Sequence, residues 1–405
     1  MNTLNKDIKL TEVQKQAVDL TLNHFRVGKN TIIAGYAGTG KSTLVRFFIQ
    51  ELLNKKLIAE NEITFTAFTG KACQILTNKG CPAVTLHKLL YDVIAWPNGS
   101  VSFELKYELD YKLVIVDECS MVPMNMYQEL ISFGVPLVFL GDPGQLPPIQ
   151  EGADNHLLSH PDIFLTEVLR QAQGSPIIRL SMKIRNHESI DDFNFPEARV
   201  IRKNQLKIED LKTADMILVG TNDMRKKVNK AMRKLLGKKG LIDENEKLIC
   251  TLNYWENEIE DSLTNGTVGL LREVKDSEKN YSLKSKNYDE RLKKFVIKKD
   301  VVSVPTFAGC FTSEAGLEKY INIDRKFLTD EVSTLSIEQK AKIKPRKAQP
   351  LEFTYAYAIT GHKAQGSEWN KVVIFEESFP FGEDHTKWLY TCVTRACKEV
   401  ILVRP

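Results

Sequence analysis

The chain has 405 residues, 42% of them hydrophobic and 27% charged, a composition typical of soluble globular proteins with two or three domains. No apolar run is long enough to span a membrane, and the first ten residues hold no apolar signal-peptide core, so we expect a cytosolic protein. The seven cysteines are scattered without a C-x-x-C pair, which favours reduced thiols over disulfides or zinc. The net charge of +4 does not by itself indicate a nucleic-acid partner.

A phosphate-binding loop is predicted at residues 35–42, which match the pattern G-x-x-x-x-G-K-[ST]. A buried strand is expected before it, at residues 31–34, and a helix after it, which is the context that the motif requires. Lys41 is predicted to reach the β- and γ-phosphates of a nucleotide, and the Ser42 hydroxyl to ligate Mg²⁺. The expected nucleotide-binding residues of this loop are Gly35, Gly38, Thr39, Gly40, Lys41, Ser42 and Thr43.

Upstream of the loop, a helix is predicted to start near Thr11. Thr11 as N-cap and Gln14 three residues on would form a capping box. Gln14 would otherwise read the adenine edge, and the two interpretations are about equally favoured.

A second strand-to-helix unit is predicted at residues 63–76, and Thr85 and His87 follow near a turn. Residues 96–104 then predict a small β-hairpin turned at residues 97–100, with Phe103 as a candidate exposed aromatic side chain.

Two acidic residues end an apolar strand predicted at residues 112–116. A carboxylate at the carboxyl end of such a strand meets the nucleotide-bound metal, so we assign Asp117 to Mg²⁺ and Glu118 to the base that activates water. A further buried strand precedes a Gly/Pro loop that would hold Gln145 near the γ-phosphate. Arg170 and Arg395 are candidate arginine fingers, with an ordinary surface arginine as the alternative for Arg170.

A second α/β set is predicted from residue 215, followed at residues 224–239 by a basic helix that is either a solvated face or a phosphate contact. From residue 250 the sequence becomes irregular and charged, which predicts a small, short-stranded β-barrel insert. The α/β pattern returns at residue 353. Thr360, His362 and Lys363 then crowd onto one turn after a strand, which suggests backbone or phosphate contact.

These blocks, in this order, resemble the motif series of superfamily 1 helicases, specifically superfamily 1B and its RecD, Dda and Pif1-like branch. The resemblance spans almost the whole chain and is carried by LTEVQ, GYAGTGKS, TAFTGKA, TLHKLL, DECS, GDPGQLPP, LTEVLRQ, TGHKAQGSE and LYTCVTRA. Two positions depart from the family pattern: Phe68 stands where proline is common, and Gly361 replaces a usual apolar residue.

The resemblance implies an α/β fold with two RecA-like P-loop domains that clamp ATP, one at residues 1–168 and one at residues 169–249 with 349–405. It also implies a pin hairpin at residues 91–110 and an SH3-like β-barrel inserted at residues 250–348, entered near Asn253 and Tyr254. The implied catalytic residues are Lys41, Asp117, Glu118, Gln145, Arg170 and Arg395, acting with ATP and Mg²⁺. The implied DNA contacts are Thr66, Thr69, Lys71, Thr85, His87, Thr360, His362 and Lys363, with Phe103 as a wedge.

The function that follows is an ATP-dependent DNA helicase moving 5′ to 3′ on single-stranded DNA, acting as a monomer on forks and with single-strand-binding or replication proteins as partners. Two alternatives stay open. One is a single-strand translocase that does not unwind, and the other is a P-loop phosphotransferase with a small acceptor.

Overall fold

The computed structural model describes residues 10–95, 101–147, 156–252, 254, 263–289, 294–314, 316–343, 349–377 and 382–405. The predicted turn at residues 97–100 and the predicted barrel entry at Asn253 lie outside these ranges. The chain divides into two compact units. Unit 1 consists of Met1–Asp92, Leu105–Lys227 and Ala358–Pro405, and unit 2 of Val93–Glu104 and Val228–Tyr357.

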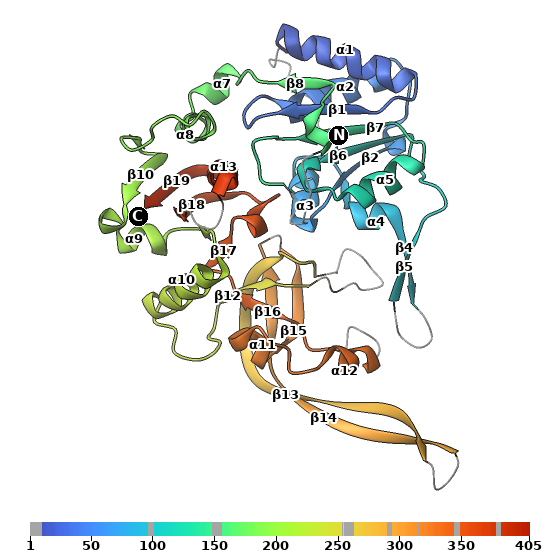
Figure 1. Cartoon of the computed structure of the whole chain (residues 1–405), viewed down its shortest axis with the longest axis vertical. Coiled ribbons are helices and arrows are strands. Elements are labelled where there is room, and N and C mark those ends of the chain that lie inside the picture. Colours follow the sequence, from blue (N-terminus) through green and yellow to red (C-terminus); the bar gives the residue numbers. More distant parts are fainter. Residues whose placement is uncertain are drawn as a thin grey trace. The chain divides into compact units, whose positions relative to one another are not determined.

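The first sheet of unit 1 has six parallel strands in the order β3-β2-β6-β7-β1-β8 (Figure 1). Its central strands are continuous apolar runs because helices cover both faces of the sheet. Phe48 and Leu52 of α2 are fully buried with α1 and α3 on one face, and Leu90 and Leu130 are buried with α4, α5 and α6 on the other. The strands are β1 (Thr31–Gly35), β2 (Ile63–Ala67), β3 (Ala83–Thr85), β6 (Leu113–Asp117), β7 (Leu137–Gly141) and β8 (Ile163–Leu165), and the helices are α1 (Glu12–Arg26), α2 (Lys41–Asn54), α3 (Gly70–Asn78), α4 (Leu86–Leu90), α5 (Met124–Ser132) and α6 (His156–Ser159).

The second sheet of unit 1 has the order β17-β11-β18-β19-β10-β9 and is parallel except for the edge strand β9. Helix α13 buries Trp388 and Tyr390 almost completely. The strands are β9 (Asn194–Phe195), β10 (Ala198–Arg202), β11 (Met216–Val219), β17 (Ala358–Thr360), β18 (Trp369–Phe375) and β19 (Ala396–Arg404), and the helices are α7 (Arg170–Gln173), α8 (Pro176–Arg185), α9 (Ile208–Lys212) and α13 (His385–Val393). Helix α10 (Asn222–Leu235) begins in unit 1 and ends in unit 2.

Unit 2 contains an antiparallel five-stranded sheet in the order β15-β14-β13-β12-β16. Its core packs around Phe311 and Phe353. The elements are β12 (Glu246–Cys250), β13 (Val268–Asp289), β14 (Lys294–Ser313), β15 (Glu318–Asp324), β16 (Phe353–Tyr355), α11 (Arg325–Asp330) and α12 (Ile337–Lys342). The antiparallel β character of the predicted insert is therefore observed, whereas its SH3-like strand arrangement and the predicted domain boundaries stay predictions.

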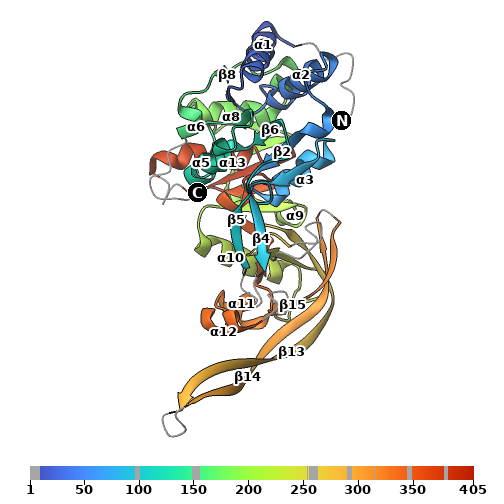
Figure 2. The ribbon, with the colours of Figure 1, turned by 90° about the vertical axis from the view of Figure 1, so that its right-hand side faces the viewer.

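The expectation of short strands in this region was wrong. β13 and β14 have 22 and 20 residues and pair from Gly269↔Ser313 to Asp289↔Lys294, well beyond the rest of the sheet (Figure 2). Among the residues of their outer part whose burial is described, a small cluster around Tyr281, Leu283 and Val304 is buried.

The predicted hairpin is present as the two-stranded sheet of β4 (Tyr91–Ala95) and β5 (Val101–Leu105). Phe103 of β5 is 43% exposed. Within the described residues, no helix combines the length and apolarity needed to cross a membrane.

Candidate active site

The phosphate loop joins β1 to α2 in unit 1. Gly38 and Gly40 have φ values of +77° and +82°, which glycine adopts without strain. A Cβ at Gly40 would lie 2.6 Å from Gln14 Nε2 and 2.8 Å from Leu169 Cδ1. Neighbouring side chains therefore leave no room for a side chain at this position. Lys41 Nζ donates to the carbonyl oxygens of Gly35, at 2.5 Å, and Tyr36, at 3.2 Å. The ammonium group is therefore held against the inner side of the loop.

Gln14 is 2% exposed, and both polar atoms of its side-chain amide are hydrogen-bonded within the chain. The predicted capping box is present, since Thr11 N donates to Gln14 Oε1 at 3.1 Å and Gln14 N to Thr11 Oγ1 at 3.2 Å. Gln14 Nε2 also donates to Thr39 O at 3.1 Å, which fastens α1 to the phosphate loop. Contact between Gln14 and an adenine stays a prediction.

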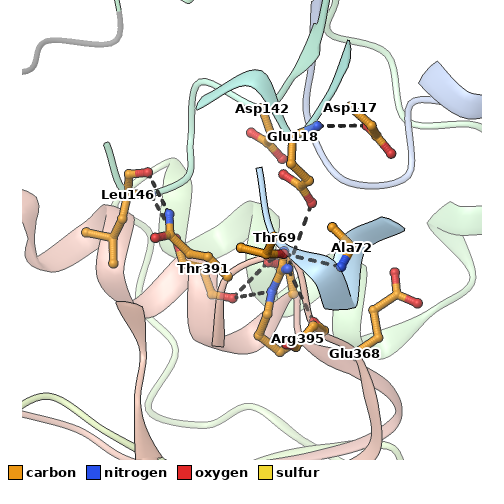
Figure 3. Close-up of polar contacts among 12 residues, drawn as sticks. Thr69, Ala72, Asp117, Glu118, Asp142, Leu146, Glu368, Thr391 and Arg395 are labelled. Carbon is orange, nitrogen blue, oxygen red and sulfur yellow. Dashed lines mark hydrogen bonds and ion pairs between the residues drawn. The ribbon is translucent and has the colours of Figure 1, made fainter. Parts of the chain in front are cut away.

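The two acidic residues after β6 lie opposite an arginine of the second sheet (Figure 3). Glu118 N donates to Asp117 Oδ1 at 3.0 Å, and Glu118 has a φ of +50°, an uncommon conformation for a non-glycine residue. Glu118 Oε1 lies 3.9 Å from Arg395 Nη1. Burial raises the pKa of both carboxyls, while the hydrogen bond from Glu118 N counteracts this for Asp117 and Arg395 counteracts it for Glu118.

Arg395 is 4% exposed, and hydrogen bonds fix its side chain. Its Nε donates to Thr391 O at 3.1 Å and its Nη1 to Ser367 O at 3.3 Å. These bonds orient the guanidinium group of this candidate finger toward the acidic residues of the first sheet. Arg170 begins α7, but its side chain lies outside the described part of the structure.

One pocket of unit 1 brings the predicted chemistry together. Gln145 is 5% exposed there, and its Oε1 has no hydrogen-bond partner among the described residues, so this buried acceptor fits a donor from a bound molecule. Carboxylate and hydroxyl oxygens beside a lysine and an arginine suit a magnesium nucleotide. The lining includes Gly38, Lys41, Ser42, Asp117, Glu118, Asp142, Gln145, Glu368 and Arg395.

Two of the predicted DNA contacts, Thr69 and Lys71, lie where the two sheets of unit 1 meet. A Cβ on Gly366 would lie 2.9 Å from Thr69 Oγ1, and Lys71 Nζ lies 4.0 Å from the ring centroid of Trp369. The Thr69 hydroxyl also caps α3 by accepting from Ala72 N at 3.2 Å (Figure 3).

The other predicted contacts of the first sheet have structural roles. Thr85 caps α4 through Lys88 N, at 3.3 Å. His87 lies half-buried near Phe68 and Tyr91, and this burial lowers its pKa, which favours the neutral ring. Thr66 is fully buried in β2, and its contact with a DNA strand stays a prediction.

In the second sheet, the predicted turn after β17 presents its polar groups unevenly. Thr360 is 8% exposed, His362 is half-buried with a pKa lowered by burial, and Lys363 is exposed. A side chain at Gly361 would come within 2.7 Å of Trp388 and Cys392, which explains why glycine stands here.

Both interpretations of the basic helix α10, a solvated face and a phosphate contact, stay open. Lys227, Lys230 and Lys234 are exposed, whereas Arg225 and Asn229, on the same helix, are 5% and 2% exposed. The burial of these two polar residues was not predicted from the sequence.

The sequence analysis also missed Asp142 and Tyr390. Asp142 is 1% exposed and accepts a hydrogen bond from the hydroxyl of Tyr390 at 2.7 Å. Both residues lie inside quoted motifs, but only the fold places the two motifs side by side.

Comparison with known proteins agrees with this geometry. Residues 9–200 match the family described as an AAA domain, and residues 355–403 match the UvrD-like helicase C-terminal domain. The chain is 32% identical over 192 residues to the ATP-dependent DNA helicase dda of Enterobacteria phage T4, covering 44% of this chain and 43% of that protein. It is 33% identical over 190 residues to the ATP-dependent RecD2 DNA helicase of Deinococcus radiodurans, covering 44% of this chain and 24% of that protein.

Among solved structures, the Bacteroides Pif1 helicase in complex with ADP-AlF3 and single-stranded DNA matches with a TM-score of 0.51 at 16% identity, over 98% of this chain and 92% of that one. These likenesses confirm the predicted α/β fold class with two RecA-like sheets. The fold is that of the helicase-type P-loop proteins. The chain is similar to helicases of the RecD, Dda and Pif1-like branch of superfamily 1B. Its matched segments cover less than half the length of the phage and Deinococcus relatives.

Proposed function

We propose that the protein is an ATP-dependent DNA helicase that moves 5′ to 3′ along single-stranded DNA and unwinds duplex DNA. The observation that carries this proposal is the pocket in which the phosphate loop and acidic pair of the first sheet meet Arg395 of the second. A site made from both sheets gives nucleotide binding a means of drawing them together.

Within this site each residue has a distinct task. Lys41 binds the β- and γ-phosphates, and Glu118 accepts a proton from the attacking water. Gln145 orients that water, while Arg395 stabilises the charge that develops on the transferred phosphoryl group, with Arg170 as the second proposed finger. Ser42 and Asp117 would hold Mg²⁺, which neutralises phosphate charge when bound.

Single-stranded DNA is proposed to contact Thr69 and Lys71 of the first sheet. The proposed contacts in the second sheet are His362 and Lys363, on the turn after β17. A motor must accept every base sequence, so we expect these residues to contact mainly phosphates, with affinity that falls as salt rises. Phe103, on β5 of the β4–β5 hairpin, is proposed to separate the two DNA strands of the duplex. Single-strand-binding and replication proteins, a monomeric state and a cytosolic location complete the proposal.

Two duplexes, one with a 5′ and one with a 3′ single-stranded overhang, test the proposal. We expect ATP-dependent unwinding of the 5′-tailed duplex only. Unwinding from the 3′ tail alone would overturn the proposed direction. ATP turnover stimulated by single-stranded DNA without unwinding of either duplex would favour the translocase. Absence of stimulation would favour the phosphotransferase.

A further inference from the structure

A buried tyrosine hydroxyl joins three parts of the candidate active site. Tyr390 of α13 is 1% exposed. Its hydroxyl donates to Asp142 Oδ2 at 2.7 Å and accepts from Ala37 N at 2.8 Å. Ala37 belongs to the phosphate loop, and Asp142 begins the loop after β7. One oxygen atom of the second sheet's helix thus contacts both loops of the first sheet.

Asp142 depends on this hydroxyl. The carboxylate is 1% exposed and accepts from Gly144 N, at 2.9 Å, through its other oxygen. Burial and the neighbouring Asp142 raise the pKa of Tyr390 well above its usual value, so the hydroxyl stays protonated and can donate. A buried carboxylate that loses such a donor is costly, since its desolvation is then less well compensated.

Other contacts join the same loops to the second sheet. Leu146 N donates to Thr391 Oγ1 at 3.0 Å, and Gln365 Nε2 donates to Leu146 O at 2.8 Å. The guanidinium of Arg185, at the end of α8, lies 3.6 Å from the ring centroid of Tyr36. Neighbouring residues of the phosphate loop, Tyr36 and Ala37, are therefore contacted by α8 and α13 respectively.

We propose that Tyr390 is a positioning residue whose hydroxyl links closure of the two sheets around the nucleotide to the alignment of Arg395, five residues further along the chain. This inference rests on the proposed ATPase site. Tyr390 can meet its two partners, Ala37 and Asp142, only when the sheets are together, so the two hydrogen bonds favour the closed arrangement over an open one. In that arrangement Arg395 Nη1 lies 3.9 Å from Glu118 Oε1, beside the proposed site of the nucleotide phosphates.

The test is Tyr390→Phe, which keeps the ring and removes only the hydroxyl. We expect kcat/KM for ATP, measured without DNA, to fall about tenfold, as for loss of a hydrogen bond to a charged group. The matched control is Tyr357→Phe in unit 2, where a buried tyrosine donates to the buried Glu246 carboxylate at 3.0 Å. A purely structural role would lower the melting temperature of both variants and leave kcat/KM of the folded protein unchanged, and this result would overturn the proposal.

A double-mutant cycle with Asp142→Asn tests the route of the effect. If Tyr390 acts through Asp142, the second substitution should change kcat/KM less than twofold in the Tyr390→Phe background, though it lowers it alone. Fully additive losses would contradict the proposal. If the wild-type protein hydrolyses ATP but DNA does not stimulate it, the proposed helicase function is refuted. The double-mutant cycle can still be carried out, because it uses ATP hydrolysis without DNA. If the wild type hydrolyses no ATP, the affinity for a non-hydrolysable ATP analogue replaces kcat/KM in this cycle. A change of less than twofold in the Tyr390→Phe background is again expected, and fully additive losses would again contradict the proposal.

Discussion

Glu118 shows how a single residue combines a backbone requirement with a chemical one. Its φ of +50° is unfavourable for a non-glycine residue, and the resulting turn directs the carboxylate toward Arg395, 3.9 Å away. The sequence predicted the carboxylate because it directly follows an apolar strand. The left-handed turn was not predictable, since Glu at that position carries no signal for a positive φ.

Replacing Glu118 by glutamine should separate nucleotide binding from turnover. The amide has nearly the same shape but cannot accept the proton of water, so we expect turnover to fall about 10²- to 10⁴-fold. Binding of a fluorescent ATP analogue should stay within about threefold. Steady-state turnover and fluorescence titration measure the two effects, and turnover within twofold of wild type would exclude Glu118 as the base.

Lys41→Ala provides the complementary case. The ammonium that bonds Gly35 O and Tyr36 O is lost, and with it the charge that binds the phosphates. We expect turnover to be abolished while single-stranded DNA binding, measured by anisotropy, stays measurable. Unchanged turnover would remove the basis for the whole site.

At the scale of elements, the sequence predicted those that are buried on both faces. β1, β6 and β7 are largely apolar runs that end beside functional residues, so their place in a parallel sheet followed from pattern alone. The length of β13 and β14 was not predictable, because the chain there is rich in charged residues although its backbone pairs from Gly269↔Ser313 to Asp289↔Lys294. Hydrophobic periodicity detects strands that bury one face. It does not detect a strand that is held mainly by backbone hydrogen bonds to its neighbours.

The β4–β5 hairpin yields a prediction of its own. Phe103 is 43% exposed, so truncating it should cost little folding stability. If its ring stacks on a base at the fork, Phe103→Ala should slow unwinding roughly tenfold, consistent with ~1–3 kcal/mol for base stacking. DNA-stimulated ATP turnover should be unchanged.

Tyr320→Ala is the matched control, because Tyr320 is a 60% exposed aromatic residue on β15 of the same unit. It should leave both activities at the wild-type level. Equal loss of unwinding and turnover in Phe103→Ala would show that Phe103 is structural.

At the scale of the whole molecule, order and spacing of motifs carried more information than composition. A net charge of +4 left the partner open, whereas nine short blocks in a fixed order predicted two RecA-like sheets. The contacts that join those sheets, such as Tyr390 with Ala37 and Asp142, were not predictable, because they link residues 353 and 248 positions apart in the chain.

The measurement that tests the central claim most directly is the steady-state rate of ATP hydrolysis with and without single-stranded DNA. If the pocket is the site of a motor, strand binding across the two sheets should favour their closure, and turnover should rise on adding DNA and saturate with it. The same rise should be absent in Lys41→Ala. Equal turnover with and without DNA, at concentrations where the strand is bound, would contradict the account.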